Sequence, residues 1–363
     1  MRFFDFFPSP TYLRITATGF DIGDQSLKYV KLRREKENFR LVAFGKKSIP
    51  REIIESGQIK NKEEFKKILG EFRRELKEDY IIISLPEEKA FIGTIRLPLI
   101  KEEEVRNSLE TQLEEHIPLP LKEIVFDYEI IEQADKATKG YLDISYTAVP
   151  LILVESYRDA LRSVGFVPIV FETEPHALVR AFIKPEEKSS QMIIDFGRTR
   201  TSFIIVSGRR VELSSTIKLG GETLETAISK SLNVSAEESS HLKQRADLLK
   251  GKGDDENIFS AILPATSAIR GEAQRHLIYW KTHIGERDIA HKEVEKIILC
   301  GGDANLKGLP QYFSSELHLP VELGNPWINI ASFEDYIPEI EFNDALTYST
   351  AIGLALRSFS KND

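Results

Sequence analysis

Apolar residues near the start of the chain recur first at the spacing of strands and then at the spacing of a helix. Residues 13–22, 27–32 and 39–49 are rich in β-branched and apolar side chains, which predicts three strands. Residues 61–78 place apolar side chains on one helical face and Lys and Glu on the other, which predicts an amphipathic helix. Residues 80–85 form a short apolar run typical of a buried strand. The predicted order is strand, strand, strand, helix, strand.

The same order returns in the second half of the chain. The second unit consists of predicted strands at 192–195, 201–207, 211–219 and 294–300 and a helix at 222–232. About 174 residues separate the equivalent positions Asp21 and Asp195, each near the end of the first strand of its unit. A repeated α/β unit predicts two lobes that face each other across a cleft, and such clefts are common ligand sites.

Additional elements lie between the two units. A helix at 101–116, strands at 124–131 and 141–149 and a helix at 153–164 predict a small α+β subdomain inserted into the first unit. The predicted division is a first lobe in 1–86, the inserted subdomain in 87–168, a return to the first lobe in 169–190, a second lobe in 191–345 that contains its own subdomain at about 225–290, and a C-terminal helix in 346–363 that packs on the first lobe.

Composition and charge exclude several classes of protein. The net charge of −8 comes without a basic tail, which argues against nucleic acid as the main partner. The single cysteine excludes an intramolecular disulfide and a cysteine-based zinc cluster, so we expect a reducing compartment. No stretch approaches the roughly 20 apolar residues that span a bilayer. The apolar residues 1–8 predict an arm that packs on the protein or a partner, or else inserts weakly into a membrane surface. We therefore expect a cytoplasmic protein.

The residues that follow the first strand of each unit are suited to binding phosphate. Gly23 allows close approach of the backbone, Lys28 on the returning strand supplies a positive charge, and Asp21 can hold Mg²⁺ through water. Residues 195–202 place Asp195, glycine and hydroxyls at the equivalent point of the second unit. One such turn is ordinary, but two that face each other predict a clamp for the phosphates of a nucleotide and its metal ion.

These motifs carry a resemblance to a known family. The matching segments are 97–98, 114–120 and 127–128, then 148–150, 157, 160–161, 165–166 and 174–177, then 195–202 with 220–221, and finally 301–309 with 319–321 and 325–326. Together they resemble the PilM family, the cytoplasmic proteins of type IV pilus assembly within the actin-like ATPase superfamily of actin, Hsp70, sugar kinases and FtsA. The resemblance implies an α/β fold with duplicated actin-like domains, a central nucleotide cleft and an inserted α+β subdomain.

The resemblance also implies roles for individual residues. The first phosphate loop would use Asp21, Gly23, Asp24, Gln25, Ser26 and Lys28, and the second would use Asp195, Gly197, Arg198, Thr199, Arg200 and Thr201. The nucleoside would lie against Gly220, Gly221, Glu238, Lys243, Gly301, Gly302, Asp303 and Asn305. Asp195 is one candidate catalytic residue, and Glu172 or Glu174 would orient water, with Glu174 preferred. The implied cofactors are ATP or ADP and Mg²⁺, with Asp21 and Asp195 as metal ligands.

Three residues depart from the family pattern. Asp24 stands where the family usually has Ser, and Arg198 and Arg200 replace small residues of the second loop. The two arginines could cap the terminal phosphate or point to solvent. Hydrolysis also needs a positioned water, and no residue clearly supplies that role. The sequence therefore predicts nucleotide binding with at most slow ATPase activity.

The resemblance implies a scaffold for assembly of a type IV pilus or a related secretion machine at the inner membrane. Its partner would be the cytoplasmic amino-terminal tail of a PilN-like membrane protein, so that membrane contact is indirect, and self-association is a further possibility. Two alternatives remain: an FtsA-like polymerising protein of cell division, and a small-molecule kinase of the same superfamily.

Overall fold

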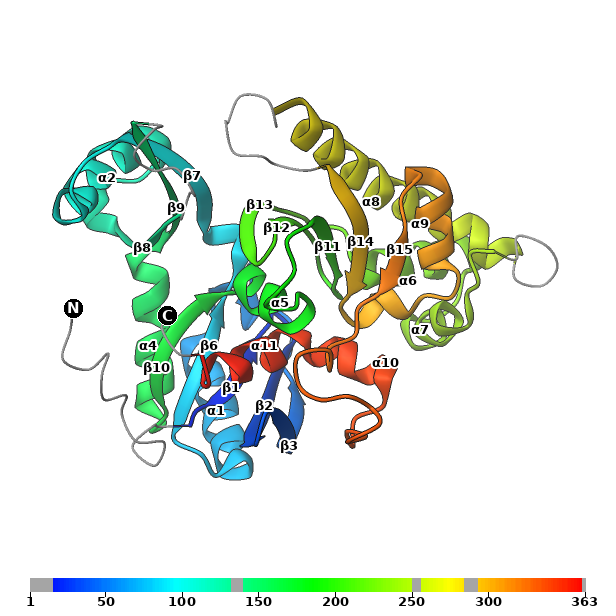
Figure 1. Cartoon of the computed structure of the whole chain (residues 1–363). Helices are drawn as coiled ribbons and strands as arrows, with labels where there is room; N and C mark the ends of the chain where they lie inside the picture. Colours follow the sequence, from blue (N-terminus) through cyan, green and yellow to red (C-terminus); the bar gives the residue numbers. More distant parts are fainter. Residues whose placement is uncertain (1–15, 132–139, 250–255, 284–292, 361–363) are drawn as a thin grey trace.

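Two five-stranded sheets of matching topology form the framework of the protein (Figure 1). The computed structural model describes residues 16–131, 140–249, 256–283 and 293–360. The arm predicted at 1–8 lies outside these residues.

The first sheet has the strand order β10-β6-β1-β2-β3. Its strands are β1 (Thr18–Ile22), β2 (Ser26–Glu35), β3 (Asn38–Ser48), β6 (Tyr80–Leu85) and β10 (Val167–Thr173). β1 pairs antiparallel with β2 and parallel with β6. A short hairpin that the sequence did not reveal, β4 (Ile54–Glu55) with β5 (Gln58–Ile59), precedes helix α1 (Lys62–Leu76).

The second sheet has the strand order β13-β12-β11-β14-β15. Its strands are β11 (Ser190–Phe196), β12 (Thr201–Ser207), β13 (Arg210–Ile217), β14 (Val294–Cys300) and β15 (Val321–Leu323). β11 pairs antiparallel with β12 and parallel with β14, as β1 does with β2 and β6. Asp21 pairs with Lys28 in the first sheet, and Asp195 pairs with Ser202 in the second. The predicted repeat is therefore confirmed strand by strand.

Helices cover the outer face of each sheet. Helix α1 is capped before its first residue by Asn61, whose side chain accepts the Glu64 N–H, and after its last residue by Lys77, which has left-handed backbone angles. Its buried Phe65 and Phe72 pack on the first sheet, and full burial of such a side chain stabilises a fold by about 1.5–3 kcal/mol. The second sheet is covered by α6 (Gly221–Leu232), α7 (Ala236–Arg245), α8 (Glu256–His283) and α9 (Leu309–Leu317).

The inserted subdomain has its own core. It contains β7 (Phe91–Pro98), α2 (Glu102–His116), β8 (Ile124–Ile130) and β9 (Tyr141–Pro150), with the strand order β7-β9-β8. Helix α4 (Leu151–Ser163) lies within the range predicted for this subdomain, but its buried Leu153, Tyr157 and Leu161 pack with the core of the first sheet. The first lobe therefore resumes at α4, where the chain leaves β9.

Two helices pack between the sheets. α5 (Glu174–Phe182) and α11 (Ser349–Arg357) share a buried cluster with apolar residues of both sheets, and Figure 1 shows them at the centre of the molecule. A β-carbon on Gly19 of β1 would overlap the α11 backbone, so this glycine permits helix and strand to touch. A short helix, α10 (Phe342–Ala345), precedes α11.

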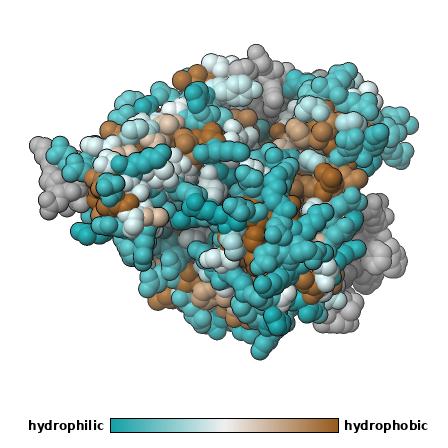
Figure 2. All heavy atoms as spheres, turned by 180° about the vertical axis from the view of Figure 1, so that it is seen from behind, coloured by the Kyte–Doolittle hydropathy of each residue, from teal (hydrophilic) through white to brown (hydrophobic). Residues whose placement is uncertain are grey.

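The outer surface is mainly polar on the face opposite to that of Figure 1, where hydrophobic side chains form small separate groups (Figure 2). Among the described residues, none of the helices is both long enough and apolar enough to cross a membrane.

Candidate functional site

A cavity of about 970 Å³ opens between the two sheets. The β1–β2 turn and the β11–β12 turn both line it. The predicted site residues that line it are Asp21, Gly23, Asp24, Gln25, Ser26, Lys28, Glu174, Asp195, Gly197, Arg198, Thr199, Arg200, Lys243, Gly301, Gly302, Asp303 and Asn305. Five predicted residues, Glu172, Thr201, Gly220, Gly221 and Glu238, are not among its lining residues.

The first loop is fixed by an ion pair between adjacent strands. Lys28 Nζ lies 3.0 Å from Asp21 Oδ2, and Ser84 Oγ donates to Asp21 Oδ1 at 3.0 Å. The Gly23 N–H donates to the Ser26 carbonyl oxygen at 3.0 Å, which closes the turn. Burial alone would lower the pKa of Lys28, but the charge and hydrogen bond of Asp21 outweigh it and raise that pKa. Lys28 therefore stays charged in the cavity.

The second loop is held by residues behind it. The Gly197 N–H donates to the Arg200 carbonyl oxygen at 3.0 Å, and the Gly221 N–H donates to the Gly197 carbonyl oxygen at 3.0 Å. A β-carbon on Gly220 would lie 2.5 Å from the Arg198 carbonyl oxygen. Thr201 is fully buried, and its hydroxyl donates to the carbonyl oxygen of a residue next to Gly220. Thr201, Gly220 and Gly221 thus brace the loop from outside the cavity.

Carboxylates dominate the charge of the cavity wall. Among the described residues that line it, the acidic ones are Asp21, Asp24, Glu174, Asp195, Glu225, Asp303 and Asp344, and the basic ones are Lys28, Lys46, Arg198, Arg200 and Lys243. Burial raises the pKa of Asp195 to about 6 and that of Glu174 to about 8. With seven carboxyl groups against five basic groups, the wall does not supply the net positive charge that a polyphosphate without a cation would need. Carboxylate oxygens are the ligands that Mg²⁺ prefers, so the wall suits a ligand that carries this ion.

Arg200 joins the second loop to three carboxylates. Its Nη2 lies 2.7 Å from Glu174 Oε1, and its Nη1 lies 3.5 Å from both Asp24 Oδ2 and Glu88 Oε2. Asp24 and Arg200, two of the three departures from the family pattern, are therefore partners across the cleft. Its guanidinium is buried among these carboxylates and does not point to solvent, which was one of the two uses predicted for Arg200. The capping of a phosphate stays a prediction, since Arg200 also lines the cavity.

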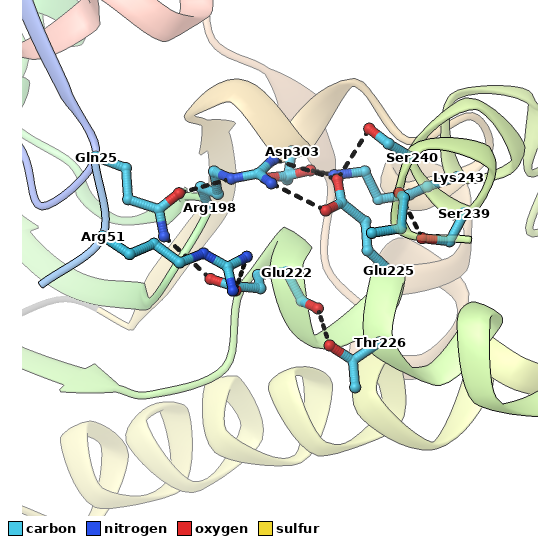
Figure 3. A network of polar contacts seen from close by, with 11 residues as sticks. Gln25, Arg51, Arg198, Glu222, Glu225, Thr226, Ser239, Ser240, Lys243 and Asp303 are labelled. Carbon is cyan, nitrogen blue, oxygen red and sulfur yellow. Dashed lines mark hydrogen bonds and ion pairs between the residues drawn. The ribbon is translucent and has the colours of Figure 1, made fainter. Parts of the chain in front are cut away.

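Arg198 belongs to a second network that spans the cleft, drawn in Figure 3. Its guanidinium forms two hydrogen bonds with Glu225, at 3.2 and 3.0 Å, and its Nε donates to Gln25 Oε1 at 2.9 Å. Gln25 Nε2 donates in turn to Glu222 Oε2 at 3.1 Å, and Arg51 pairs with the same glutamate. Gln25 and Arg51 belong to the first lobe and the other residues to the second, so this network links the lobes at the mouth of the cavity.

The side of the cavity predicted for the nucleoside contains Gly301, which has no side chain, and a hydrogen-bond acceptor, Asn305 Oδ1. Gly301 has φ 88°, and a β-carbon there would overlap the Asp195 carboxylate. Asn305 Nδ2 donates to a carbonyl oxygen at 2.8 Å, whereas its buried Oδ1 has no hydrogen-bond partner among the described residues. Lys243 Nζ lies 2.5 Å from Asp303 Oδ1 and 2.9 Å from Glu225 Oε1. Gly301 thus allows its backbone to lie against the Asp195 carboxylate, and the unpaired Asn305 Oδ1 fits a ligand that carries an N–H group.

Glu238 lies on the same helix as Lys243 but does not reach the cavity. It is exposed in the first turn of α7, where its N–H donates to the capping Ser235 hydroxyl. Ser240, Lys243 and Gln244 are the α7 residues that line the cavity. Glu238 therefore lies on a different face of α7 from the residues that line the cavity.

Lys46 is a cavity residue that sequence reasoning missed. It lies directly opposite Lys28 in the β2–β3 ladder, so the two side chains share one face of the sheet. No carboxylate forms an ion pair with it among the described residues. Burial lowers the pKa of Lys46, and the neighbouring charge of Lys28 lowers it further. The clue in the sequence was its position on β3, but only the strand register shows which lysine of the pair 46–47 faces the cavity.

Comparison with known proteins agrees with this architecture. A family model described as type IV pilus assembly protein PilM matches residues 19–359. A solved PilM-PilN type IV pilus biogenesis complex contains a chain with TM-score 0.79 and 22% identity, and the alignment covers 96% of this chain and 99% of that one. MreB5 of Spiroplasma citri was solved bound to AMPPNP and to ADP; both structures are 14% identical over 94% of this chain and 96% of theirs, with TM-scores of 0.54 and 0.53. The predicted duplicated actin-like fold is confirmed.

Proposed function

This chain belongs to the family of the type IV pilus assembly protein PilM, and from that premise we propose that it is a nucleotide-binding scaffold of pilus assembly. The family match favours this function over the FtsA-like and kinase alternatives. The single observation that carries nucleotide binding is the pair of equivalent loops, at Asp21 and Asp195, on opposite walls of one cavity. The cavity volume of about 970 Å³ lies within the range of about 300–1,000 Å³ typical of small-molecule sites.

In the proposed complex the nucleotide is ATP or ADP bound with Mg²⁺. Asp21 and Asp195 would hold the ion through water, and the ion would neutralise phosphate charge that the acidic wall cannot accept. Lys28 and Lys46 would face the phosphates, while Gly301 and Asn305 would face the nucleoside. The structures of MreB5 with ADP and AMPPNP support this choice of ligand by their similar fold.

We propose at most slow hydrolysis. A general base must be unprotonated and free to contact water, but Glu174 Oε1 lies 2.7 Å from Arg200 Nη2. The guanidinium occupies that carboxylate oxygen, which makes Glu174 a poor base in this arrangement.

The proposed partner is the cytoplasmic amino-terminal tail of a PilN-like membrane protein, bound near the inserted subdomain. The similarity to a chain of a PilM-PilN complex supports this partner. The protein would then be cytoplasmic and peripheral to the inner membrane, held there through its partner. A nucleotide that bridges the two lobes can favour one closure angle, and so change partner affinity by its differential binding to the two states.

The decisive experiment measures Mg·ATP binding by calorimetry, and phosphate release separately, for wild type and Asp195→Ala. Asp127→Ala on the exposed face of β8 is the matched control. We expect binding by wild type and the control, loss of at least about tenfold in affinity for Asp195→Ala, and little phosphate release by any of them. Wild-type protein that binds no nucleotide, or an Asp195→Ala variant that binds as wild type does, contradicts the proposal. Capture by a tail peptide with and without nucleotide then tests the gating.

A further inference from the structure

The neck that connects the first lobe to the inserted subdomain is attached to the second lobe. It runs from β6 to β7 and contains a 3₁₀ turn, η3 (Glu87–Lys89). Glu87 is buried and accepts hydrogen bonds from the hydroxyls of Ser214 and Thr216, both on β13 of the second sheet. Figure 1 shows β7 leaving the first sheet beside β13. The neck is therefore attached to a strand of the second lobe, although it connects the first lobe to the inserted subdomain.

The adjacent residue of the neck, Glu88, contacts Arg200, which lines the cavity. Glu88 Oε2 lies 3.5 Å from Arg200 Nη1, and the Arg200 side chain is only 14% exposed. Burial raises the pKa of Glu88, against the opposing effect of the Arg200 charge. Glu88 Oε1 is buried without a hydrogen-bond partner among the described residues, so the arginine is its main compensation. The energy of this buried carboxylate therefore depends on the position of the Arg200 guanidinium.

Arg200 also holds the first lobe. Its other partners are Asp24 in the β1–β2 loop and Glu174 at the start of α5. One guanidinium thus serves three carboxylates that come from the phosphate loop, the neck and the helix between the sheets. A guanidinium has five N–H donors, and a phosphate oxygen that entered the cavity would compete with these carboxylates for them.

We propose that Arg200 fastens the neck of the inserted subdomain to the nucleotide cavity, so that occupancy of the cavity controls how firmly the subdomain is held. If Arg200 Nη1 turns toward a phosphate, its ion pair with Glu88 weakens, which loosens the neck while Glu87 keeps it beside β13. The coupling is reciprocal, so a partner that fixes the subdomain changes nucleotide affinity by the same factor. The fastening stands on the contacts alone, whereas its control by nucleotide rests on the proposed function.

The fastening is tested without nucleotide by hydrogen exchange of the amides in residues 86–98. We expect Glu88→Gln and Arg200→Gln to exchange there about tenfold faster than wild type, equivalent to about 1.4 kcal/mol of local stability. The control is Glu71→Gln, which removes the same charge from an ion pair with Lys47 in the first lobe. We expect it to leave residues 86–98 unchanged. If Glu88→Gln folds with wild-type melting behaviour and shows wild-type exchange, the fastening is refuted.

The control by nucleotide is tested by adding Mg·ADP or Mg·AMPPNP to the same proteins. We expect faster exchange at 86–98 in wild type on binding, most with AMPPNP, and no further increase in Glu88→Gln although it still binds. Wild-type protein that binds nucleotide with no change at 86–98 refutes the coupling. Wild-type protein that binds no nucleotide refutes the proposed function, and with it the coupling, while the nucleotide-free comparison still decides the fastening.

Discussion

Gly353 of α11 lies directly against Ala177 of α5: a β-carbon on the glycine would overlap the Ala177 carbonyl oxygen. These two helices pack between the sheets and share the cluster that joins both lobes. The contact is made through main-chain atoms, which cannot move aside as the end of a long side chain can. The interface between the lobes therefore depends on a position with no side chain.

Gly353→Ala is expected to destabilise the protein by about 1–3 kcal/mol or more, because overpacking at a fixed backbone forces the helices apart. The matched control is Gly271→Ala in α8, where nothing lies within 4 Å of the added β-carbon. Since alanine is the better helix former, we expect that change to be neutral or to stabilise by up to about 1 kcal/mol. Thermal and urea unfolding of both variants measure the difference. Equal melting of Gly353→Ala and wild type would refute the expectation.

Lys46→Gln is expected to weaken binding of Mg·ATP by about tenfold, the effect of losing one hydrogen bond to a charged group at a half-exposed site. Lys47→Gln is the control, because the neighbouring lysine pairs with Glu71 and Glu75 of α1 on the other face of the sheet. Titration calorimetry at two salt concentrations measures both variants. The prediction fails if the two substitutions have the same effect on affinity.

Removal of divalent cations is expected to lower ATP affinity by at least about tenfold, since the cavity wall carries more carboxylates than basic groups. Adding Mg²⁺ back to protein treated with a chelator should restore the affinity. AMP, which has one phosphate, should respond much less than ATP. An ATP affinity that is independent of Mg²⁺ would show that the carboxylates are neutralised within the protein.

The ion pair of Glu172 and Arg180 should govern part of the acid stability. Its two hydrogen bonds, both 2.6 Å, join β10 to α5. Burial alone would raise the pKa of Glu172, but the hydrogen bonds and charge of Arg180 reverse this and lower it. The stabilisation is therefore complete above the ordinary pKa of about 4.3 and is lost as pH falls through the lower folded value.

Two substitutions test this pair. Arg180→Met should cost about 3–5 kcal/mol at neutral pH, because it removes both hydrogen bonds of a buried carboxylate and leaves it the more distant charge of Arg357. Glu172→Gln should flatten the fall in unfolding free energy below pH 4.5 relative to wild type. Free energies of unfolding from urea titrations between pH 3 and 7 measure both effects. Parallel pH profiles for wild type and Glu172→Gln would show that the pair contributes nothing to acid stability.

Much of the framework could be predicted because the signals are local. The apolar face of α1 and the turns at Asp21 and Asp195 each lie within a few neighbouring positions, and the repeat follows from comparing two such stretches. Strand β7 was missed, because Gly93 and the polar Arg96 interrupt its apolar pattern. Helix α4 was assigned to the wrong core, since an amphipathic pattern shows that a helix has a buried face but does not show which core that face joins.

The partners of Arg200 could not be predicted. Glu88 and Asp24 lie more than a hundred residues away along the chain, and no local pattern relates an arginine in one loop to a carboxylate in another. The same holds for Lys46, whose position in the cavity follows from its register with Lys28. The sequence showed that Asp24, Arg198 and Arg200 were unusual, and only the fold shows that Asp24 and Arg200 are unusual together.

The position of α11 in the chain has a consequence for biosynthesis. About 330 residues separate β1 from the helix that covers it, so a ribosome working at about 5–20 residues per second leaves that face of β1 bare for roughly 17–66 s. The second sheet, by contrast, is encoded by one continuous stretch and can fold earlier. The nascent first lobe is thus the part most exposed to chaperones and proteases. A chain released before residue 349 would expose the apolar surface of β1 that α11 normally covers, which would mark it for degradation.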